Sequence, residues 1–259
     1  MSPKPTIVFV AGAWHGPELW DKVSTLLEEQ DYRCVAVALP TTQSTAAGIS
    51  DDVKAVRHAI EAETSQGRDV VVVAHSYGGV VGPSAIKDLT AKTDAQGSSF
   101  GCVRGLVMMA TGFMPTGVGF LEAGGGTPPP IWRVDEESGL AVITVEPREL
   151  FYHDIPEEEG DEWVSKLRKQ SLKAFTDGTD VYAGWQDVPV WYLATVDDKA
   201  FPGEAQKMVL QMAKDTMGAK VTMSRDISAG HSPMLSKPGE VAGFISEAAQ
   251  AFSSGDGDA

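Results

Sequence analysis

One short segment limits strongly what this chain can fold into. Residues 70–79 read VVVVAHSYGG, a β-branched run that passes directly into a small-x-Ser-x-Gly turn. Such a run predicts a strand buried on both faces, and the pattern after the turn predicts a helix. Ala74 and Gly78, two positions before and after Ser76, are small enough for the backbones to approach closely. The segment therefore predicts a strained strand-to-helix turn that exposes the Ser76 hydroxyl beside a helix N-terminus.

A glycine-rich turn between a strand and a helix can also hold a phosphate group. A Walker-type loop requires a Lys-[Ser/Thr] pair after its glycines, and a dinucleotide-binding turn requires G-x-G-x-x-G spacing. Neither pattern is present around Ser76. We therefore interpret Ser76 as a candidate nucleophile and keep phosphate binding as the alternative.

The composition argues against several classes of partner. The 259 residues carry a formal net charge of −15, whereas nucleic acids and anionic membranes bind basic surfaces. No apolar run approaches the length of a membrane span, and no basic-then-apolar leader precedes the first predicted strand. We expect a cytoplasmic protein that binds a small-molecule substrate, with neither nucleic acid nor membrane as a partner. The oligomeric state is left open.

Two cysteines, Cys34 and Cys102, lie in segments that read as strands. Free cysteine is among the most often buried residue types, so we expect both in the core of a protein from a reducing compartment. Neither is surrounded by residues with metal-ligand spacing, and we expect no metal site.

Strand-like and helix-like segments alternate along most of the chain. This alternation predicts a mostly parallel, doubly wound α/β sheet with helices on both faces. The predicted strands are 6–10, 35–39, one beginning at Val70, 103–110, 188–195 and 219–224; the predicted helices are 17–30, 50–65, one after Ser76, 203–217 and 237–252.

The alternation is interrupted between Thr111 and Asp187. This stretch contains a Gly-rich and then Pro-rich loop at 124–130, a short strand at 140–145 and one or two helices within 156–175. We predict that residues 1–110 and 188–252 form the core, that 111–187 form a small inserted lid, and that 253–259 form a disordered tail.

Aromatic residues are frequent in the predicted lid. Most buried aromatic side chains serve packing, but a lid over an active site also supplies the walls of an apolar pocket. The candidates for substrate contact are Trp14, Phe113, Trp132, Phe151 and Trp185.

A serine hydroxyl is a weak nucleophile until a base takes its proton. Of the five histidines, His231 is the candidate base, because its loop lies between a predicted strand and the last helix. That position is the carboxyl edge of the sheet, where Ser76 also emerges. His75 should point away from Ser76, His58 lies within a helix and His153 lies in the insertion.

The base needs an acid that fixes its tautomer, and the reaction needs backbone N–H groups that bind the developing oxyanion. In hydrolases of this design the acid lies between serine and histidine along the chain. The loop after the strand 188–195 offers Asp197 and Asp198, and either could serve. We expect the oxyanion donors to be Tyr77, which follows the serine, and Ala13, in the loop after the first strand.

Four stretches of the sequence carry a family resemblance: GAWHG at 12–16 with Trp20, AHSYGG at 74–79, DKAFP at 198–202 and GHSPML at 230–235. Together they resemble the α/β-hydrolase superfamily. Within it the chain is similar to the compact group of plant methyl-ester esterases, plant hydroxynitrile lyases and their bacterial and fungal esterase relatives. The resemblance implies a small lid over an apolar pocket and no metal or organic cofactor. It also favours Asp198 over Asp197, because the acid of this group stands shortly before the proline that opens the next helix.

Two departures from the group bear on the reaction. The hydroxynitrile lyases carry a lysine directly after the catalytic histidine and a threonine in the first oxyanion loop, where this chain has Ser232 and Gly12. Both argue against cyanohydrin cleavage. We therefore expect a serine hydrolase that cleaves a carboxylic ester or lactone of a small to medium apolar or aromatic substrate through an acyl-enzyme. The alternatives are C–C bond lyase, decarboxylase or cyclase chemistry on a polyketide-like substrate, and a non-catalytic small-molecule receptor.

Overall fold

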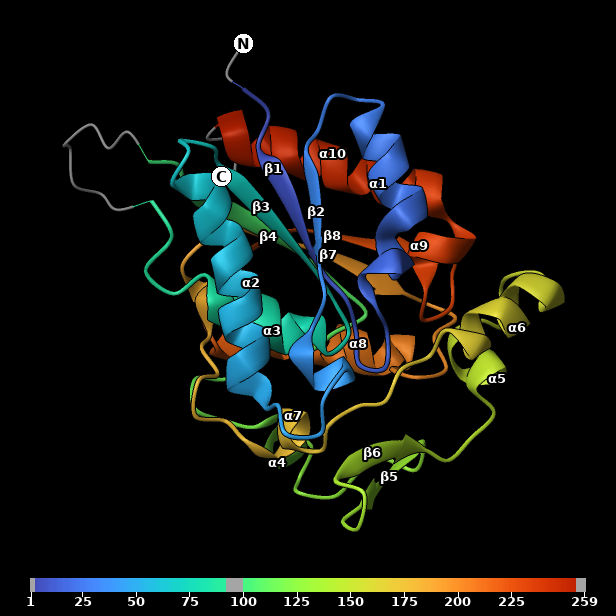
Figure 1. Ribbon diagram of the computed structural model, residues 1–259. Helices are drawn as coiled ribbons and strands as arrows, with labels where there is room; N and C mark the ends of the chain where they lie inside the picture. Colours follow the sequence, from blue (N-terminus) through green and yellow to red (C-terminus); the bar gives the residue numbers. More distant parts are fainter. Residues whose placement is uncertain (1–2, 92–99, 255–259) are drawn as a thin grey trace.

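A six-stranded parallel sheet forms the centre of the computed structural model, which describes residues 3–91 and 100–254 (Figure 1). Its strand order is β2-β1-β3-β4-β7-β8, and every neighbouring pair is parallel. The predicted doubly wound α/β sheet is thereby confirmed. The strands are β1 (Thr6–Val10), β2 (Cys34–Val37), β3 (Val70–His75), β4 (Val103–Met109), β7 (Val190–Thr195) and β8 (Val221–Ile227).

Helices cover the sheet, and α1 packs on α10 while α2 packs on α3. No helix within the described ranges is long and apolar enough to cross a membrane. The helices that belong to the α/β alternation are η1 (Pro17–Trp20), α1 (Asp21–Glu28), η2 (Pro40–Thr42), α2 (Ile49–Thr64), α3 (Gly78–Ala85), α8 (Gly203–Thr216), α9 (Pro233–Ser236) and α10 (Pro238–Ser254).

Successive side chains of a strand point to opposite faces of the sheet. Those of the central strands are buried on both faces because other side chains pack against each face. On one face Phe9 of β1 stacks on Trp20, with 4.7 Å between the ring centroids. On the other face Ala74 of β3 lies so close to Gly82 of α3 that a Cβ at Gly82 would be 3.1 Å from the Ala74 Cβ. This close packing holds the end of β3 firmly in place.

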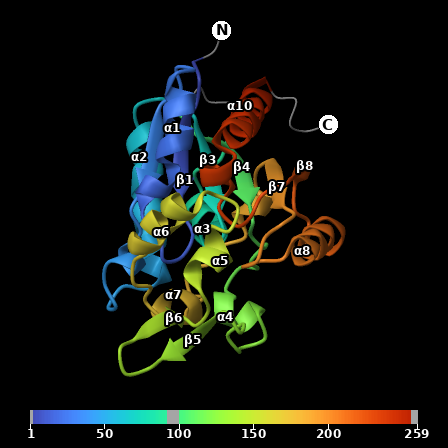
Figure 2. The same ribbon diagram turned by 90° about the vertical axis from the view of Figure 1, so that its right-hand side faces the viewer.

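The insertion lies between β4 and β7, and most of its elements gather at the end of the sheet where α3 begins (Figures 1 and 2). The predicted strand at 140–145 is present as β6, paired antiparallel with a strand that the sequence did not reveal. The elements of the insertion are α4 (Phe120–Ala123), β5 (Trp132–Asp135), β6 (Leu140–Ile143), α5 (Pro147–Phe151), α6 (Glu157–Ser165), α7 (Lys173–Thr176) and η3 (Gly184–Gln186).

Between α6 and α7 the chain is not helical, although the sequence allowed a single helix through 156–175. Its backbone bonds to distant segments instead: Arg168 N–H donates to Trp14 O at 2.8 Å, and Ser171 N–H donates to Thr41 O at 2.9 Å. A helix would use these groups internally, so the tertiary bonds replace helical ones here.

Two smaller expectations need correction. Cys34 and Cys102 carry free thiols but are half-buried, because β2 is an edge strand and Cys102 precedes β4 instead of lying within it. In the segment 253–259, Ser253 and Ser254 belong to α10, and residues 255–259 lie outside the described residues.

Glu63 of α2 is a nearly buried carboxylate at the amino end of the sheet. One of its oxygens accepts hydrogen bonds from Thr6 Oγ1 at 3.0 Å, Arg33 Nε at 2.9 Å and Arg68 Nε at 2.6 Å. Burial alone would raise the pKa of Glu63, but the bonds from Arg68, Arg33 and Thr6 outweigh it and lower the pKa to about 2. Glu63 thus ties α2 to β1 as a charged group.

Glu63→Gln is expected to destabilise the protein at neutral pH by on the order of 2 kcal/mol. Because the folded-state pKa is depressed, this stabilisation is fully present above the ordinary value of 4.5 and is lost as the pH falls toward 2. Urea unfolding of both proteins at a series of pH values measures the difference. The matched control is Glu61→Gln, since Glu61 pairs with Arg57 on the surface. A stability gap that stays constant into acid would contradict this role of Glu63.

Candidate active site

Ser76 lies at the tip of a strained turn between β3 and α3. Its φ is 51°, in the left-handed region that residues with a side chain rarely adopt. A Cβ at Gly78 would lie 2.5 Å from the carbonyl oxygen of Val10 and 2.7 Å from that of Ala11. The turn can therefore form only with glycine at this position, and the predicted tight strand-to-helix turn is present.

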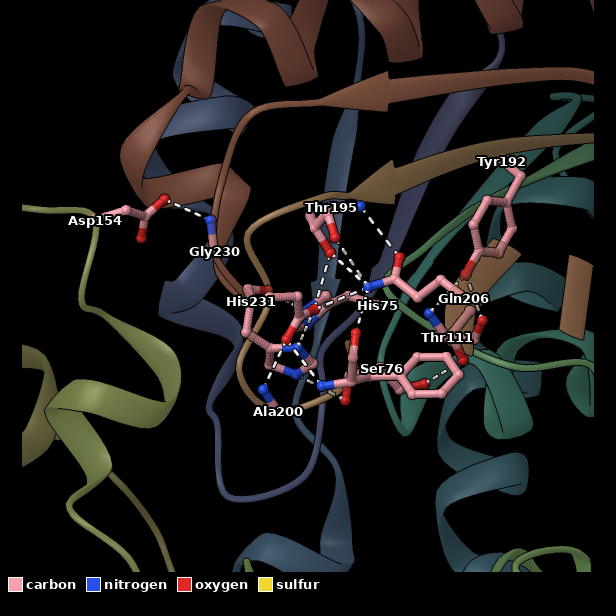
Figure 3. Close-up of polar contacts among 12 residues, drawn as sticks. His75, Ser76, Thr111, Asp154, Tyr192, Thr195, Ala200, Gln206, Gly230 and His231 are labelled. Atoms are coloured by element: carbon pink, nitrogen blue, oxygen red, sulfur yellow. Dashed lines mark hydrogen bonds and ion pairs between the residues drawn. The ribbon is translucent and has the colours of Figure 1, made fainter. Parts of the chain in front are cut away.

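His231 faces Ser76 from the loop between β8 and α9 (Figure 3). Its Nε2 lies 3.0 Å from Ser76 Oγ, and its Nδ1 lies 2.8 Å from Oδ2 of Asp198. The histidine is 4% exposed and the aspartate 6% exposed. The structure thus brings the three predicted residues into one continuous series of hydrogen bonds, in which the Ser76 hydroxyl can donate to a ring nitrogen whose tautomer Asp198 fixes.

The geometry separates the two aspartates that the sequence left open. Asp198 Oδ1 accepts the backbone N–H groups of Ala200 and Phe201, each at 2.8 Å, and Oδ2 accepts Thr195 Oγ1 at 2.8 Å. Burial raises the pKa of Asp198, but His231 and these hydrogen bonds outweigh burial and hold the pKa below its ordinary value. Asp197 is exposed and accepts a hydrogen bond from Ser228 instead.

Gln206 of α8 is a fully buried residue that the sequence reasoning missed. Its Nε2 lies 3.1 Å from Asp198 Oδ2 and 2.8 Å from Thr195 Oγ1, and its Oε1 accepts the Thr195 N–H at 3.1 Å (Figure 3). The amide therefore holds the carboxylate that faces His231. The available signal was its spacing, because Gln206 shares the buried face of α8 with Leu210 and Ala213.

His75 points away from Ser76, as expected from the turn, and holds the loop of His231. Its Nε2–H donates to the carbonyl oxygen of His231 at 2.8 Å, and the two ring centroids are 4.8 Å apart. Burial, reinforced by the neighbouring His231 and His15, lowers the pKa of His75 well below its ordinary value. The neutral ring therefore acts as a donor that fixes the backbone of His231.

The loop Gly12–Gly16 lies directly against Ser76, since a Cβ at Gly12 would be 3.0 Å from the Ser76 Cβ. The backbone N–H groups of Ala13 and Tyr77 donate to no acceptor in the described part of the chain. Trp14, which follows Ala13, has a φ of 62°, so the loop turns sharply after Ala13. These two N–H groups are therefore available for an oxygen atom of a ligand, as the oxyanion prediction requires.

A histidine in this loop connects it to the insertion. His15 Nδ1–H donates to Ala13 O at 2.7 Å, and its Nε2 lies 2.7 Å from the Tyr152 hydroxyl. Burial lowers the pKa of His15 to about 4, so the ring is neutral and Nε2 accepts a hydrogen bond from the Tyr152 hydroxyl. His15 is thus a structural link and not a second base.

The five aromatic residues predicted to contact substrate are all buried, and they fall into two clusters. Phe151 lies beside the catalytic candidate His231, with 5.6 Å between ring centroids, and Trp14 lies 6.1 Å from Phe151. Trp132 joins them through Phe175, which the sequence reasoning did not select; Phe175 is 4.9 Å from Trp132 and 5.8 Å from Trp14.

The second cluster contains Phe113 and Trp185, whose centroids are 5.7 Å apart. It adjoins the turn through Thr111, whose hydroxyl donates to the carbonyl oxygen of Ser76 at 2.6 Å. The indole N–H of Trp185 donates to a backbone carbonyl, as does that of Trp14. Substrate contact by the five aromatics stays a prediction.

Within residues 3–91 and 100–254, no group of three or more His, Cys, Asp or Glu side chains is arranged to hold a metal ion.

The parallel sheet, the strained serine turn and the opposed histidine define an α/β-hydrolase architecture. The chain belongs to the alpha/beta hydrolase family, which it matches over residues 7–244. It is 32% identical over 253 residues to the alpha/beta hydrolase nvfD of Aspergillus novofumigatus, covering 95% of this chain and 97% of that protein. It is 26% identical over 250 residues to the probable hydrolase R7 of a Phoma species, covering 95% and 98%.

Solved structures share the fold at lower identity. A pyrethroid hydrolase from Sphingobium faniae superimposes with a TM-score of 0.71 at 19% identity, covering 95% of this chain and 98% of the other. The methylesterase MES16 from Arabidopsis gives a TM-score of 0.70 at 19% identity, covering 95% and 99%. These similarities extend over the insertion as well as the sheet.

Proposed function

We propose that the protein is a serine hydrolase that cleaves a carboxylic ester or lactone through an acyl-enzyme. The observation that carries this proposal is the unbroken hydrogen-bonded series from Asp198 through His231 to Ser76, on a turn whose φ of 51° exposes the serine hydroxyl. A receptor would need neither the strained turn nor a buried acid behind the histidine.

In the first half of the reaction, Ser76 Oγ attacks the carbonyl carbon and its proton passes to His231 Nε2. The ionised Asp198 stabilises the imidazolium that forms, while the N–H groups of Ala13 and Tyr77 bind the oxyanion. The tetrahedral intermediate then collapses: the bond to the leaving oxygen breaks, and His231 gives its proton to the departing alcohol. The acyl group remains on Ser76.

In the second half, water takes the place of the alcohol. His231 removes a proton from the water, the hydroxide adds to the acyl carbon, and the bond from Ser76 Oγ breaks as His231 returns the proton to the serine. The acid is released and the enzyme is restored. In a lactone the leaving alcohol and the acid belong to one molecule, so the product is a hydroxy acid.

Uncharged apolar or aromatic acyl esters are the substrate class that the surroundings of Ser76 favour. The cluster of Trp14, Trp132, Phe151 and Phe175 is aromatic and adjoins His231, and the insertion that supplies most of it would serve as a lid. Relatives of the same fold include a methylesterase and a polyneuridine aldehyde esterase, which supports an ester substrate.

The test is to mix the protein with p-nitrophenyl acetate, butyrate and benzoate, quench in acid and measure intact mass. We expect release of p-nitrophenolate and a mass increase of one acyl group, located by fragmentation on the peptide that contains Ser76. A C–C lyase, decarboxylase or cyclase acting without acylation would show no adduct. Absence of both turnover and adduct would overturn the proposal.

A further inference from the structure

A chain of buried hydrogen bonds joins the two backbone segments that carry the proposed oxyanion donors. The Tyr77 hydroxyl donates to Asp52 Oδ2 at 2.9 Å, and the Thr41 hydroxyl donates to the same oxygen at 2.6 Å. Gln170 Nε2 donates to Thr41 Oγ1 at 3.0 Å, and Gln170 Oε1 accepts the backbone N–H of Trp14 at 3.1 Å. We call these five residues the Trp14–Tyr77 network.

Each member of the network is at most 9% exposed. The N–H and O–H groups all point along the series toward the Asp52 carboxylate, from Trp14 at one end and from Tyr77 at the other, so each bond polarises the next. Asp52 also accepts the Thr41 backbone N–H at 3.0 Å, which fixes the carboxylate on two sides. A buried network whose members are all satisfied is rigid, and breaking one bond leaves polar groups unpaired inside the protein.

One end of the network lies on strained backbone and the other end lies next to it. Trp14 directly follows Ala13 and has a φ of 62°, and Tyr77 directly follows Ser76, which has a φ of 51°. Left-handed residues with side chains persist only where the surrounding structure holds them. The network supplies this support from three separate segments, namely η2 through Thr41, α2 through Asp52 and the insertion through Gln170.

We propose that Thr41, Asp52 and Gln170 are positioning residues that set the distance between the N–H groups of Ala13 and Tyr77. This inference rests on the proposed function, since it assigns those N–H groups to the oxyanion. Donors stabilise an oxyanion only when both lie within a few tenths of an ångström of hydrogen-bond distance from it. A link between the two peptide segments therefore acts on the transition state and hardly at all on the bound substrate.

The neighbouring Thr42 provides a matched control. It lies in the same η2 and is equally buried, but its hydroxyl donates at 2.8 Å to Leu39 O and takes no part in the network. Tyr32 is the corresponding control for Tyr77, because its buried hydroxyl bonds to Ser246 O, remote from the network.

The experiment measures the second-order rate at which a fluorophosphonate labels Ser76, together with kcat and KM for a p-nitrophenyl ester. In labelling, the serine oxygen forms a bond to phosphorus, fluoride leaves and the serine proton passes to His231, while negative charge develops on the phosphoryl oxygen. We expect Thr41→Val and Tyr77→Phe to lower both the labelling rate and kcat by about 10- to 100-fold. KM should change little, and Thr42→Val and Tyr32→Phe should match the wild type.

The double variant Thr41→Val/Tyr77→Phe should lose less than the product of the two single losses, since both changes break one network. Equal labelling rates for Thr41→Val and Thr42→Val, or an effect confined to KM, would overturn the inference. If Thr41→Val does not fold, the labelling rates of Tyr77→Phe and Tyr32→Phe are compared instead, and equal rates would overturn the inference. A wild-type protein that is not labelled at Ser76 would instead overturn the proposed function.

Discussion

Ser76→Ala is expected to lower kcat for a p-nitrophenyl ester by about four to six orders of magnitude. The substitution removes one oxygen atom, and with it both the attacking group and the proton that His231 Nε2 receives across 3.0 Å. The loss should appear in kcat and leave KM nearly unchanged, because the aromatic cluster is untouched. Steady-state kinetics and a urea unfolding curve of the same preparation measure the two effects separately.

Ser84→Ala is the control for this variant. Ser84 is buried near the end of α3, the helix that follows the same turn, and its hydroxyl donates to Val80 O. Its removal should affect stability and leave turnover intact below the unfolding transition. Ester cleavage that survives in Ser76→Ala at more than a trace would mean that the strained turn carries some other role.

Asp198→Asn should lower kcat by about four orders of magnitude, while Asp197→Asn should change it less than about twofold. An asparagine at position 198 keeps the volume but places an NH2 group among donors: the N–H groups of Ala200 and Phe201 on one side and those of His231 and Gln206 on the other. His231 then loses the tautomer that leaves Nε2 able to accept the serine proton. Kinetics on the same ester, with circular dichroism to check folding, measures both variants.

Asp197→Asn is a matched control for Asp198→Asn. The two aspartates are adjacent, and the changes are chemically identical, yet only the side chain of Asp198 is buried against His231. A large loss in Asp197→Asn with little effect in Asp198→Asn would transfer the role of the acid to the exposed residue.

The sequence predicted the parts of the molecule whose signals are local. The β-branched run before Ser76, the small residues at the turn and the alternation of strands and helices each depend on neighbours within a few positions. His231 was found because parallel strands bring their carboxyl ends to one edge, and that rule needs only the order of the elements. The order of the residues left Asp197 and Asp198 both open as the acid, and the family resemblance favoured Asp198. The structure then placed His231 and Asp198 within hydrogen-bond distance of their partners.

The parts that were missed depend on contacts between distant segments. Gln170 is a polar residue with no local pattern that predicts burial, and its partner Thr41 lies 129 residues away. Gln206 lies on the buried face of α8, but this spacing does not reveal that its amide contacts Asp198. The non-helical stretch between α6 and α7 also depends on distant contacts, since its backbone bonds lead to Trp14 and Thr41. The bonds of Gln170, Arg168 and Ser171 join residues more than 100 positions apart, so no short window of the sequence contains both members of these pairs.

Three hydrogen bonds attach the insertion to the loop that contains Trp14. Ala141, Arg168 and Gln170 hold the indole, the carbonyl and the N–H of Trp14, respectively. A recombinant that exchanges 111–187 for the corresponding stretch of a relative would therefore replace all three contacts to the loop of the proposed oxyanion donor Ala13, together with Trp132, Phe151 and Phe175 of the aromatic cluster. Under the proposed function, we expect such a recombinant to differ from the parent in both substrate range and turnover, and we expect recombinants that keep Ala141, Arg168 and Gln170 to retain more of the parent turnover.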